Sequence, residues 1–197
     1  MKAELYADGG LVHSNPSPYG ATQGVRIVVD DTVVFEQGYF YPASFFGGSA
    51  GNNSSEVLAI ALGLEAWHNL FGTRFMGTVY TDSENAKGFY QLTNRMSVEP
   101  KVHGKVNEVL PYLGPSKWVL LDGHPSAAHL YKGTGKRGGP VSIHNVVCDE
   151  LATEAGIQAK GDYRFTLTVG YTDRIDGIVK RKLAKVKQMQ EMEGNDA

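Results

Sequence analysis

The sequence predicts an α/β domain built on a mixed sheet with helices on both faces. Its 197 residues, of which 42% are hydrophobic and 20% charged, are enough to bury one sizeable core. Three strand-like runs rich in Val, Ile, Phe and Tyr come first, and helical and strand patterns then alternate. The resulting order, β-β-β-α-β-α-(α)-β-α, predicts five strands, namely a three-strand antiparallel meander followed by parallel strands.

Local patterns place each element. Gly9-Gly10 after the first apolar run predicts a turn. Asp30-Asp31, between two runs of β-branched and aromatic residues, predicts a hairpin. From Asn53 onward apolar residues recur at a spacing of 3.6, which predicts a helix. The predicted elements are strands 3–8, 21–30, 32–41, 76–82 and 117–121, and helices from Asn53, 83–90, 105–113 and 144–155, with a Gly/Lys/Arg loop over 132–140.

Residues 159–197 are expected to form an extension to a main domain of residues 1–158. The segment 163–171 alternates like a strand, and 175–192 has the pattern of an amphipathic helix. Between residues 174 and 187 there are six Lys or Arg against one acid. Two interpretations stay open for this helix: a solvated face packed on the domain, or a basic arm that contacts a nucleic-acid backbone or a protein partner.

Composition narrows the functional class. The formal net charge is −2, so binding to a polyanion must depend on a local patch. The single cysteine, Cys148, excludes an internal disulfide framework and indicates a reducing compartment. The longest apolar run, 57–64, is too short to span a bilayer, and the opening residues do not resemble a signal peptide. We therefore expect a cytoplasmic protein without membrane association, whose protein partners and oligomeric state the sequence does not indicate.

Four acidic residues are the candidate functional residues. Asp8 and Asp82 each end an apolar run, Glu56 lies in the first turn of a predicted helix, and Asp149 lies in the last predicted helix of the domain. Each has a structural alternative. Asp8 could form a turn and Asp82 could be a helix N-cap. Glu56 could close a capping box with Asn53, and Asp149 could lie on a solvated helix face. If the first and fourth strands are adjacent, however, the acids meet at one end of the sheet. Clustered carboxylates repel unless a cation neutralises them, so the pattern predicts bound Mg²⁺.

The acids also lie within short motifs that follow one another in a characteristic order. These are Leu5-Tyr6-Ala7-Asp8-Gly9-Gly10, Asn52-Asn53-Ser54-Ser55-Glu56, Tyr80-Thr81-Asp82-Ser83, Gly123-His124-Pro125 and Asn145-Val146-Val147-Cys148-Asp149-Glu150-Leu151-Ala152. Over about residues 4–156 they resemble the ribonuclease H family, type 1. The resemblance implies a ribonuclease H-like fold and endonucleolytic hydrolysis of the RNA strand of an RNA–DNA hybrid. It also implies two Mg²⁺ ions, or Mn²⁺ in their place.

The resemblance assigns roles to individual residues. It makes Asp8, Glu56, Asp82 and Asp149 the metal ligands and catalytic acids, His124 a catalytic histidine for proton transfer and product release, and Asn15, Asn52 and Asn53 contacts to the hybrid. His129 and His144 lie in the same expanded stretch, so the choice of histidine stays open. Lys132, Lys136 and Arg137 of that stretch are expected to add phosphate contacts. Residues 88–113 contain no tryptophan, so the basic, tryptophan-rich handle of some members is expected to be absent or reduced.

Two other functions remain open at this stage. Another nuclease on the same fold, such as a junction resolvase or an exonuclease, would share the clustered acids. A non-catalytic hybrid-binding module would share the fold, but keeping four carboxylates together without a metal would cost stability. Preferred cleavage of duplex DNA or of four-way junctions would indicate the first alternative, and the absence of any cleavage with Mg²⁺ or Mn²⁺ would indicate the second.

Overall fold

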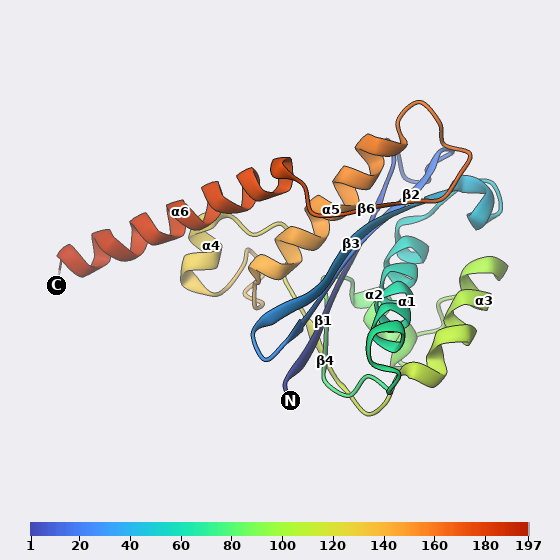
Figure 1. Ribbon diagram of the computed structural model, residues 1–197, viewed down its shortest axis with the longest axis horizontal. Coiled ribbons are helices and arrows are strands. Elements are labelled where there is room, and N and C mark those ends of the chain that lie inside the picture. Colours follow the sequence, from blue (N-terminus) through green and yellow to red (C-terminus); the bar gives the residue numbers. More distant parts are fainter. Residues whose placement is uncertain (197) are drawn as a thin grey trace.

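The computed structural model describes residues 1–196 and contains one sheet with helices on both faces (Figure 1). The strands are β1 (Ala3–Leu11), β2 (Gly20–Val29), β3 (Thr32–Pro42), β4 (Thr78–Thr81), β5 (Lys117–Leu120) and β6 (Leu167–Val169). The helices are α1 (Asn52–Phe71), α2 (Glu84–Tyr90), α3 (Pro100–Val109), α4 (Ala127–Lys132), α5 (Ile143–Ala159) and α6 (Asp173–Asn195), with short 3-10 helices η1 (Ala43–Phe46) and η2 (Leu110–Tyr112).

The strand order is β5-β4-β1-β2-β3-β6. Strands β1, β2 and β3 form the predicted antiparallel meander, and β4 and β5 add in parallel beside β1. Asp30 and Asp31 form the predicted hairpin turn, and both have the positive φ that such a tight connection requires. The prediction that the first and fourth strands are adjacent is confirmed, because β1 pairs with β4.

The predicted number of five strands is wrong, because the sheet has six. The sixth strand, β6, comes from the C-terminal segment and pairs antiparallel with Gly38–Phe40 of β3. Without it, this part of β3 would be an open edge with unpaired backbone groups. Val169 of β6 is also buried beside Phe40 and Ala155, so the added strand extends the core as well as the sheet.

One further expectation about local structure is wrong. Gly9-Gly10 does not form a turn, since β1 continues through both residues to Leu11. Helix α4 was not predicted; its N-cap Ser126 accepts a hydrogen bond from the backbone N–H of His129. The predicted helices are present with shifted ends; α3, for example, begins at Pro100 rather than at residue 105.

The two faces of the sheet are covered differently. Helix α1 packs on one face, with α2 and α3 outside it, and α5 packs on the other (Figure 1). Most of α1 is buried, because it lies between the sheet and the outer helices. Its buried apolar side chains form the main core together with Leu5, Ile27 and Val79 of the strands.

Glycines allow both helices to approach the sheet closely. A Cβ atom on Gly9 would lie 2.6 Å from the backbone N of Glu56 on α1, and one on Gly24 would lie 1.8 Å from the carbonyl oxygen of Cys148 on α5. Neither distance is sterically allowed. Because Gly24 pairs directly with Asp8, the contact also brings Asp149, the residue after Cys148, close to the middle of β1.

Gly24→Ala is expected to destabilise the protein by about 3 kcal/mol, because the backbone carbonyl of Cys148 cannot rotate away from the added methyl group. The melting temperature should fall by roughly 6–12 °C, as measured by calorimetry or circular dichroism. Gly104→Ala is the matched control. Gly104 lies within α3 with nothing within 4 Å of an added Cβ, so this change should stabilise by about 0.5–1 kcal/mol. Equal melting temperatures for the two variants would contradict the close α5 contact.

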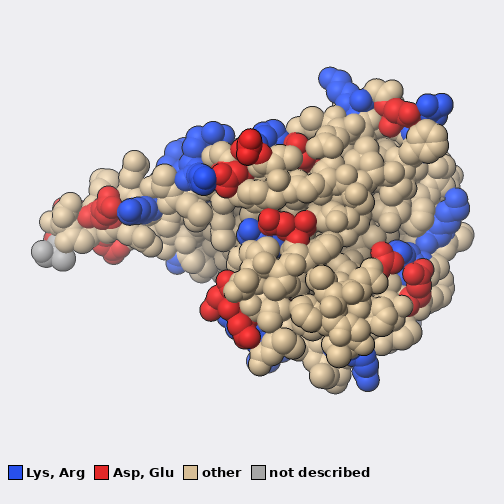
Figure 2. Space-filling model, in the orientation of Figure 1, with Lys and Arg blue, Asp and Glu red and all other residues tan. Residues whose placement is uncertain are grey.

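Helix α6 begins against α5 and then extends away from the body of the protein, ending at the C-terminus (Figure 1). Only its residues Ile175 and Val179 are buried, in a cluster with Val147 and Leu151 of α5. Lys and Arg side chains gather along the part of α6 nearer the body (Figure 2). Within residues 1–196, no helix has both the length and the apolar character that crossing a membrane requires.

Candidate active site

Three acids meet where β1 and β4 separate. The pairing of these strands ends at Tyr6 opposite Tyr80, so Asp8 and Asp82 follow at matching positions two residues later. Asp8, Glu56 and Asp82 each offer a carboxylate oxygen, and these oxygens lie within 4.8 Å of one another. Asp8 is only 4% exposed and Glu56 only 5% exposed, so two of the three carboxyl groups are almost completely withdrawn from solvent.

Glu56 reaches this cluster because α1 lies directly on β1. The backbone N–H of Gly9 donates a hydrogen bond of 2.8 Å to Oε2 of Glu56. The neighbouring Ser55 hydroxyl lies between backbone carbonyls of β1 and β2, 2.9 Å from the oxygens of Gly10 and Thr22. It also accepts a hydrogen bond from the side chain of Gln23. The Glu56 side chain is therefore held by β1, and Ser55 fixes the adjoining part of α1 to both β1 and β2.

The structural alternatives for Asp8, Glu56 and Asp82 do not hold. Asp8 lies within β1 rather than in a turn or at a strand end. Glu56 is the fifth residue of α1, beyond its first turn, and Gly51 is the N-cap without a side-chain hydrogen bond, so no capping box forms. Ser83, not Asp82, caps α2 by accepting from the backbone N–H of Ala86. None of these three acids is needed as a cap or a turn residue.

Burial and mutual repulsion raise the pKa values of the clustered acids. For Asp8, loss of solvent raises the pKa well above its ordinary value, and the charges of Glu56, Asp82 and Asp149 add to the shift. The pKa of Glu56 is raised well above its ordinary value by burial and by the charge of Asp82. Carboxylates kept close in this way attract a cation strongly, and an all-oxygen donor set suits a hard divalent ion such as Mg²⁺. The residues therefore fit the metal that the sequence predicts.

Asp149 and His124 lie at the solvent-exposed rim of the cluster. Oδ2 of Asp149 is 3.5 Å from Nδ1 of His124, and their side chains are 38% and 79% exposed. The pKa of Asp149 is raised by burial and lowered in part by His124. The adjacent Gly123 is also in contact with the site, since a Cβ there would lie 2.7 Å from Oδ2 of Asp82. The loop that carries His124 therefore contacts two of the four acids.

The other two histidines of this stretch have different surroundings. His129 completes a capping box at the start of α4, where its Nδ1 accepts from the backbone N–H of Ser126. His144 packs on the ring of Tyr6 at 4.8 Å, and its Nδ1 lies 2.9 Å from Nη1 of Arg26. Burial, followed by the positive charge of Arg26, lowers the pKa of His144. Of the three histidines, His124 is the one in contact with one of the four predicted acids, Asp149.

The predicted nucleic-acid contacts are exposed. Asn15 lies in the connection between β1 and β2, and Asn52 and Asn53 open α1, four and three residues before Glu56. Asn53 accepts a hydrogen bond from the side chain of Asn85 in α2. The basic residues Lys132, Lys136 and Arg137 are also exposed, at the end of α4 and in the turn that follows it.

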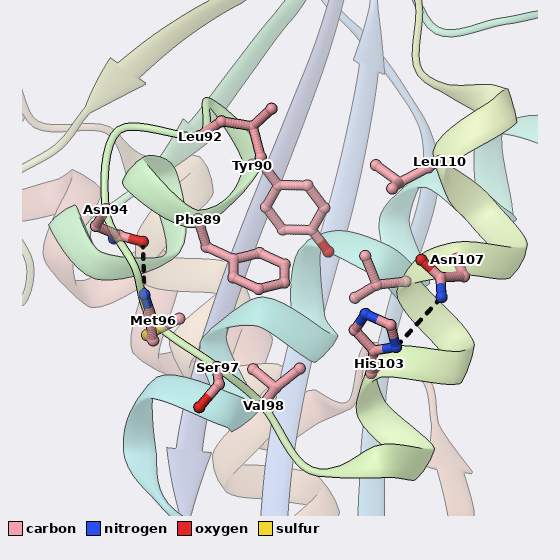
Figure 3. A pocket seen from close by; sticks show the side chains of 11 residues that line it. Phe89, Tyr90, Leu92, Asn94, Met96, Ser97, Val98, His103, Asn107 and Leu110 are labelled. Atoms are coloured by element: carbon pink, nitrogen blue, oxygen red, sulfur yellow. Dashed lines mark hydrogen bonds between the residues drawn. The ribbon is translucent and has the colours of Figure 1, made fainter.

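A pocket of about 350 Å³ lies between α2 and α3, in the region where a handle would be expected (Figure 3). Phe89 and Tyr90 face His103 and Leu110 across it, and none of the four acids lines it. Lys105 of α3 is held in an ion pair with Glu65 of α1 and is not free on the surface. This pocket is therefore separate from the acidic cluster.

The residues that hold the His124 loop were not predicted from the sequence. Asp122 accepts hydrogen bonds from the backbone N–H groups of Arg137 at 2.7 Å and Gly139 at 3.2 Å. Lys182 of α6 donates a hydrogen bond of 2.8 Å to the carbonyl oxygen of Pro125. The glycines of the 132–140 stretch were a signal for the first contact, since Gly135 and Gly139 pack against the Asp122 side chain. Nothing in the local sequence indicates the second.

Solved structures of ribonucleases H have the same fold. LC11 ribonuclease H1 in complex with an RNA/DNA hybrid is 21% identical, with a TM-score of 0.57, and the match covers 80% of this chain and 99% of that chain. Ribonuclease H1 from the halophilic archaeon Halobacterium salinarum is 22% identical, with a TM-score of 0.55 and coverage of 81% and 100%. The N-terminal ribonuclease H domain of a Mycobacterium tuberculosis protein is 20% identical, with a TM-score of 0.55 and coverage of 81% and 96%.

These similarities show that the chain has the ribonuclease H fold, an α/β fold with a mixed sheet. No family model matches the sequence, and no curated protein matches it. The fold expected from the sequence motifs is thus confirmed by comparison of structures. The cluster of Asp8, Glu56 and Asp82 lies on this fold as a group of acids able to hold a divalent metal ion.

Proposed function

We propose that the protein is a metal-dependent endoribonuclease that hydrolyses the RNA strand of RNA–DNA hybrids. The observation that carries the proposal is the meeting of Asp8, Glu56 and Asp82, whose oxygens lie within 4.8 Å of one another on a ribonuclease H fold. The hybrid bound to one structural neighbour supports this substrate class. The sequence motifs around all four acids support the same assignment.

The four acids have distinct parts in this mechanism. Asp8, Glu56, Asp82 and Asp149 would hold two Mg²⁺ ions, which when bound would polarise the attacking water and neutralise charge at the scissile phosphate. Asp8 is the most buried of the four acids, and the charges of the other three all act on its carboxyl group. Glu56 is oriented by the N–H of Gly9, so its carboxylate faces the cluster rather than solvent. Fixed carboxylates of this kind require little rearrangement when the substrate arrives.

His124 is placed to handle protons at the edge of the site. It contacts Asp149 and is mostly exposed, so one side of the imidazole faces the acids and the other faces solvent. A histidine in this position can exchange protons between the leaving group and water. Asn15, Asn52 and Asn53 offer short amides for sugar and base edges, which suits recognition of a 2′-hydroxyl.

The decisive test compares uniformly labelled RNA–DNA hybrid, RNA duplex, DNA duplex and four-way DNA junction in the presence of Mg²⁺ or Mn²⁺. We expect internal cleavage of the RNA strand of the hybrid and no cleavage of the other substrates. Preferred cleavage of the junction or of duplex DNA would instead assign another nuclease activity. Binding of the hybrid without cleavage in either metal would contradict the enzymatic proposal and leave a binding module.

His124→Ala is expected to lower kcat for the hybrid by about 10²-fold, because proton transfer then relies on water alone. His129→Ala is the matched control. It removes the same side chain from α4, where the imidazole only caps the helix, and should leave kcat unchanged. Single-turnover rates with a labelled hybrid measure the effect. A larger loss for His129→Ala than for His124→Ala would refute the choice of histidine.

A further inference from the structure

The loop that carries His124 leaves its imidazole mostly in solvent. His124 has a left-handed backbone, with φ at 50°, and its side chain is 79% exposed. The contact to Asp149, at 3.5 Å, is long for a hydrogen bond. The position of the imidazole therefore depends on the residues on either side of it.

Helix α6 holds the residue that follows His124. Pro125 is buried, and its carbonyl oxygen accepts a hydrogen bond from Nζ of Lys182 at 2.8 Å. Lys182 lies on the side of α6 that also carries Ile175 and Val179, and α6 packs against α4, which starts directly after this loop. A charged donor to a backbone carbonyl in a partly buried position is a strong type of hydrogen bond.

The same helix is anchored beside Asp149. Arg174 of α6 donates to the carboxylate of Glu150 at 2.9 Å, and Glu150 is the residue after Asp149. Arg174 also donates to Glu154 at 2.8 Å and to the backbone oxygen of Glu150 at 3.1 Å. Ile175 and Val179 pack on Val147 and Leu151 of α5. This end of α6 is therefore fixed to the turn of α5 that carries Asp149.

We propose that α6 sets the separation between His124 and Asp149, and that Lys182 is a positioning residue for His124. Arg174 and Lys182 are eight residues apart, or about 12 Å along a helix. Arg174 binds Glu150, the neighbour of Asp149, and Lys182 binds Pro125, the neighbour of His124. Helix α6 thus connects the two sides of the rim. This role rests on the proposed function, because it concerns the geometry of the histidine in that reaction.

The test uses the full-length protein and the substitution Lys182→Met, which keeps the apolar stem and removes the donor. We expect kcat for the hybrid to fall roughly tenfold with KM unchanged, since misplaced catalytic groups slow chemistry rather than binding. Lys182→Arg, which can still donate to Pro125, should restore most of the rate. Lys185→Met, at an exposed position on the same helix, should behave like the wild type.

A double-mutant cycle separates positioning from a general structural effect. If Lys182 acts through His124, then Lys182→Met should cause no further loss of kcat in a protein that already carries His124→Ala. An equal loss in both backgrounds would overturn the proposal. A rise in KM for both Lys182→Met and Lys185→Met, with kcat unchanged, would overturn it as well and would indicate that α6 instead binds the nucleic-acid backbone.

A spectroscopic measurement keeps the inference testable if the protein does not cleave the hybrid. In ¹H–¹³C spectra of the imidazoles, Lys182→Met should shift or broaden the His124 signal and leave that of His103, on α3, unchanged. Lys185→Met should change neither signal. An unchanged His124 signal in Lys182→Met would overturn the role of α6, whereas inactivity of the wild-type protein with Mg²⁺ and Mn²⁺ would overturn the proposed function alone.

Discussion

Replacing Asp8 by asparagine is expected to lower kcat/KM for an RNA–DNA hybrid by about 10³-fold or more. Asp8 is the most buried of the clustered acids, and its carboxylate lies among those of Glu56, Asp82 and Asp149. An asparagine of the same shape keeps the packing but supplies no negative charge to hold a divalent ion. Losing several kcal/mol of metal-dependent stabilisation in the transition state corresponds to a rate loss of about this size.

The matched control for this variant is Asp31→Asn. Asp31 lies in the hairpin turn, its side chain is 89% exposed, and its positive φ is one that asparagine adopts readily. The control should therefore cleave like the wild type. Initial rates on labelled hybrid measure both variants, and circular dichroism checks that each is folded. Cleavage by Asp8→Asn within tenfold of the wild-type rate would show that the cluster is not the catalytic centre.

Much of this site could be predicted because its acids lie in elements with strong local signals. The β2–β3 hairpin follows from its composition and from Asp30-Asp31, and α1 follows from its apolar spacing. Once these elements are placed, the matching positions of Asp8 and Asp82 on β1 and β4 follow from the parallel pairing of the two strands. The cluster is thus largely a consequence of strand order.

Other features could not be predicted, because they depend on contacts between distant segments. Gly9-Gly10 has the local signature of a turn, yet a glycine is needed at position 9 because the backbone of α1 leaves no room for a Cβ atom there. The strand partner of β6 is β3, far away in the sequence, and local alternation does not reveal which edge is open. Which of the three histidines lies near the acids likewise depends on the fold, which places His144 beside Arg26 and His124 beside Asp149.

The free energy of unfolding of the metal-free protein is expected to fall as the pH rises. Asp8 and Glu56 have pKa values in the folded state well above their ordinary values near 4, mainly because they are buried. The folded state therefore keeps protons that the unfolded state has already released. The stability from each group is fully present below about pH 4 and is lost as the pH rises through its folded pKa. Each pKa unit corresponds to about 1.4 kcal/mol.

Comparison with Asp8→Asn isolates this effect from other titrating groups such as His144, since those are present in both proteins. With a chelator present, the melting temperature of the wild type should fall below that of Asp8→Asn as the pH is raised from about 5 to about 9. This range lies above the ordinary carboxyl pKa near 4, so the unfolded state has already released its proton. Saturating Mg²⁺ at the alkaline end should reverse the order. Binding at one hundred times Kd adds about 2.7 kcal/mol to the wild type, or roughly 5–10 °C. If the melting temperatures of the two proteins instead differed by the same amount at every pH, with and without Mg²⁺, the pKa of Asp8 would not be raised in the folded state and Asp8 would not be a metal ligand.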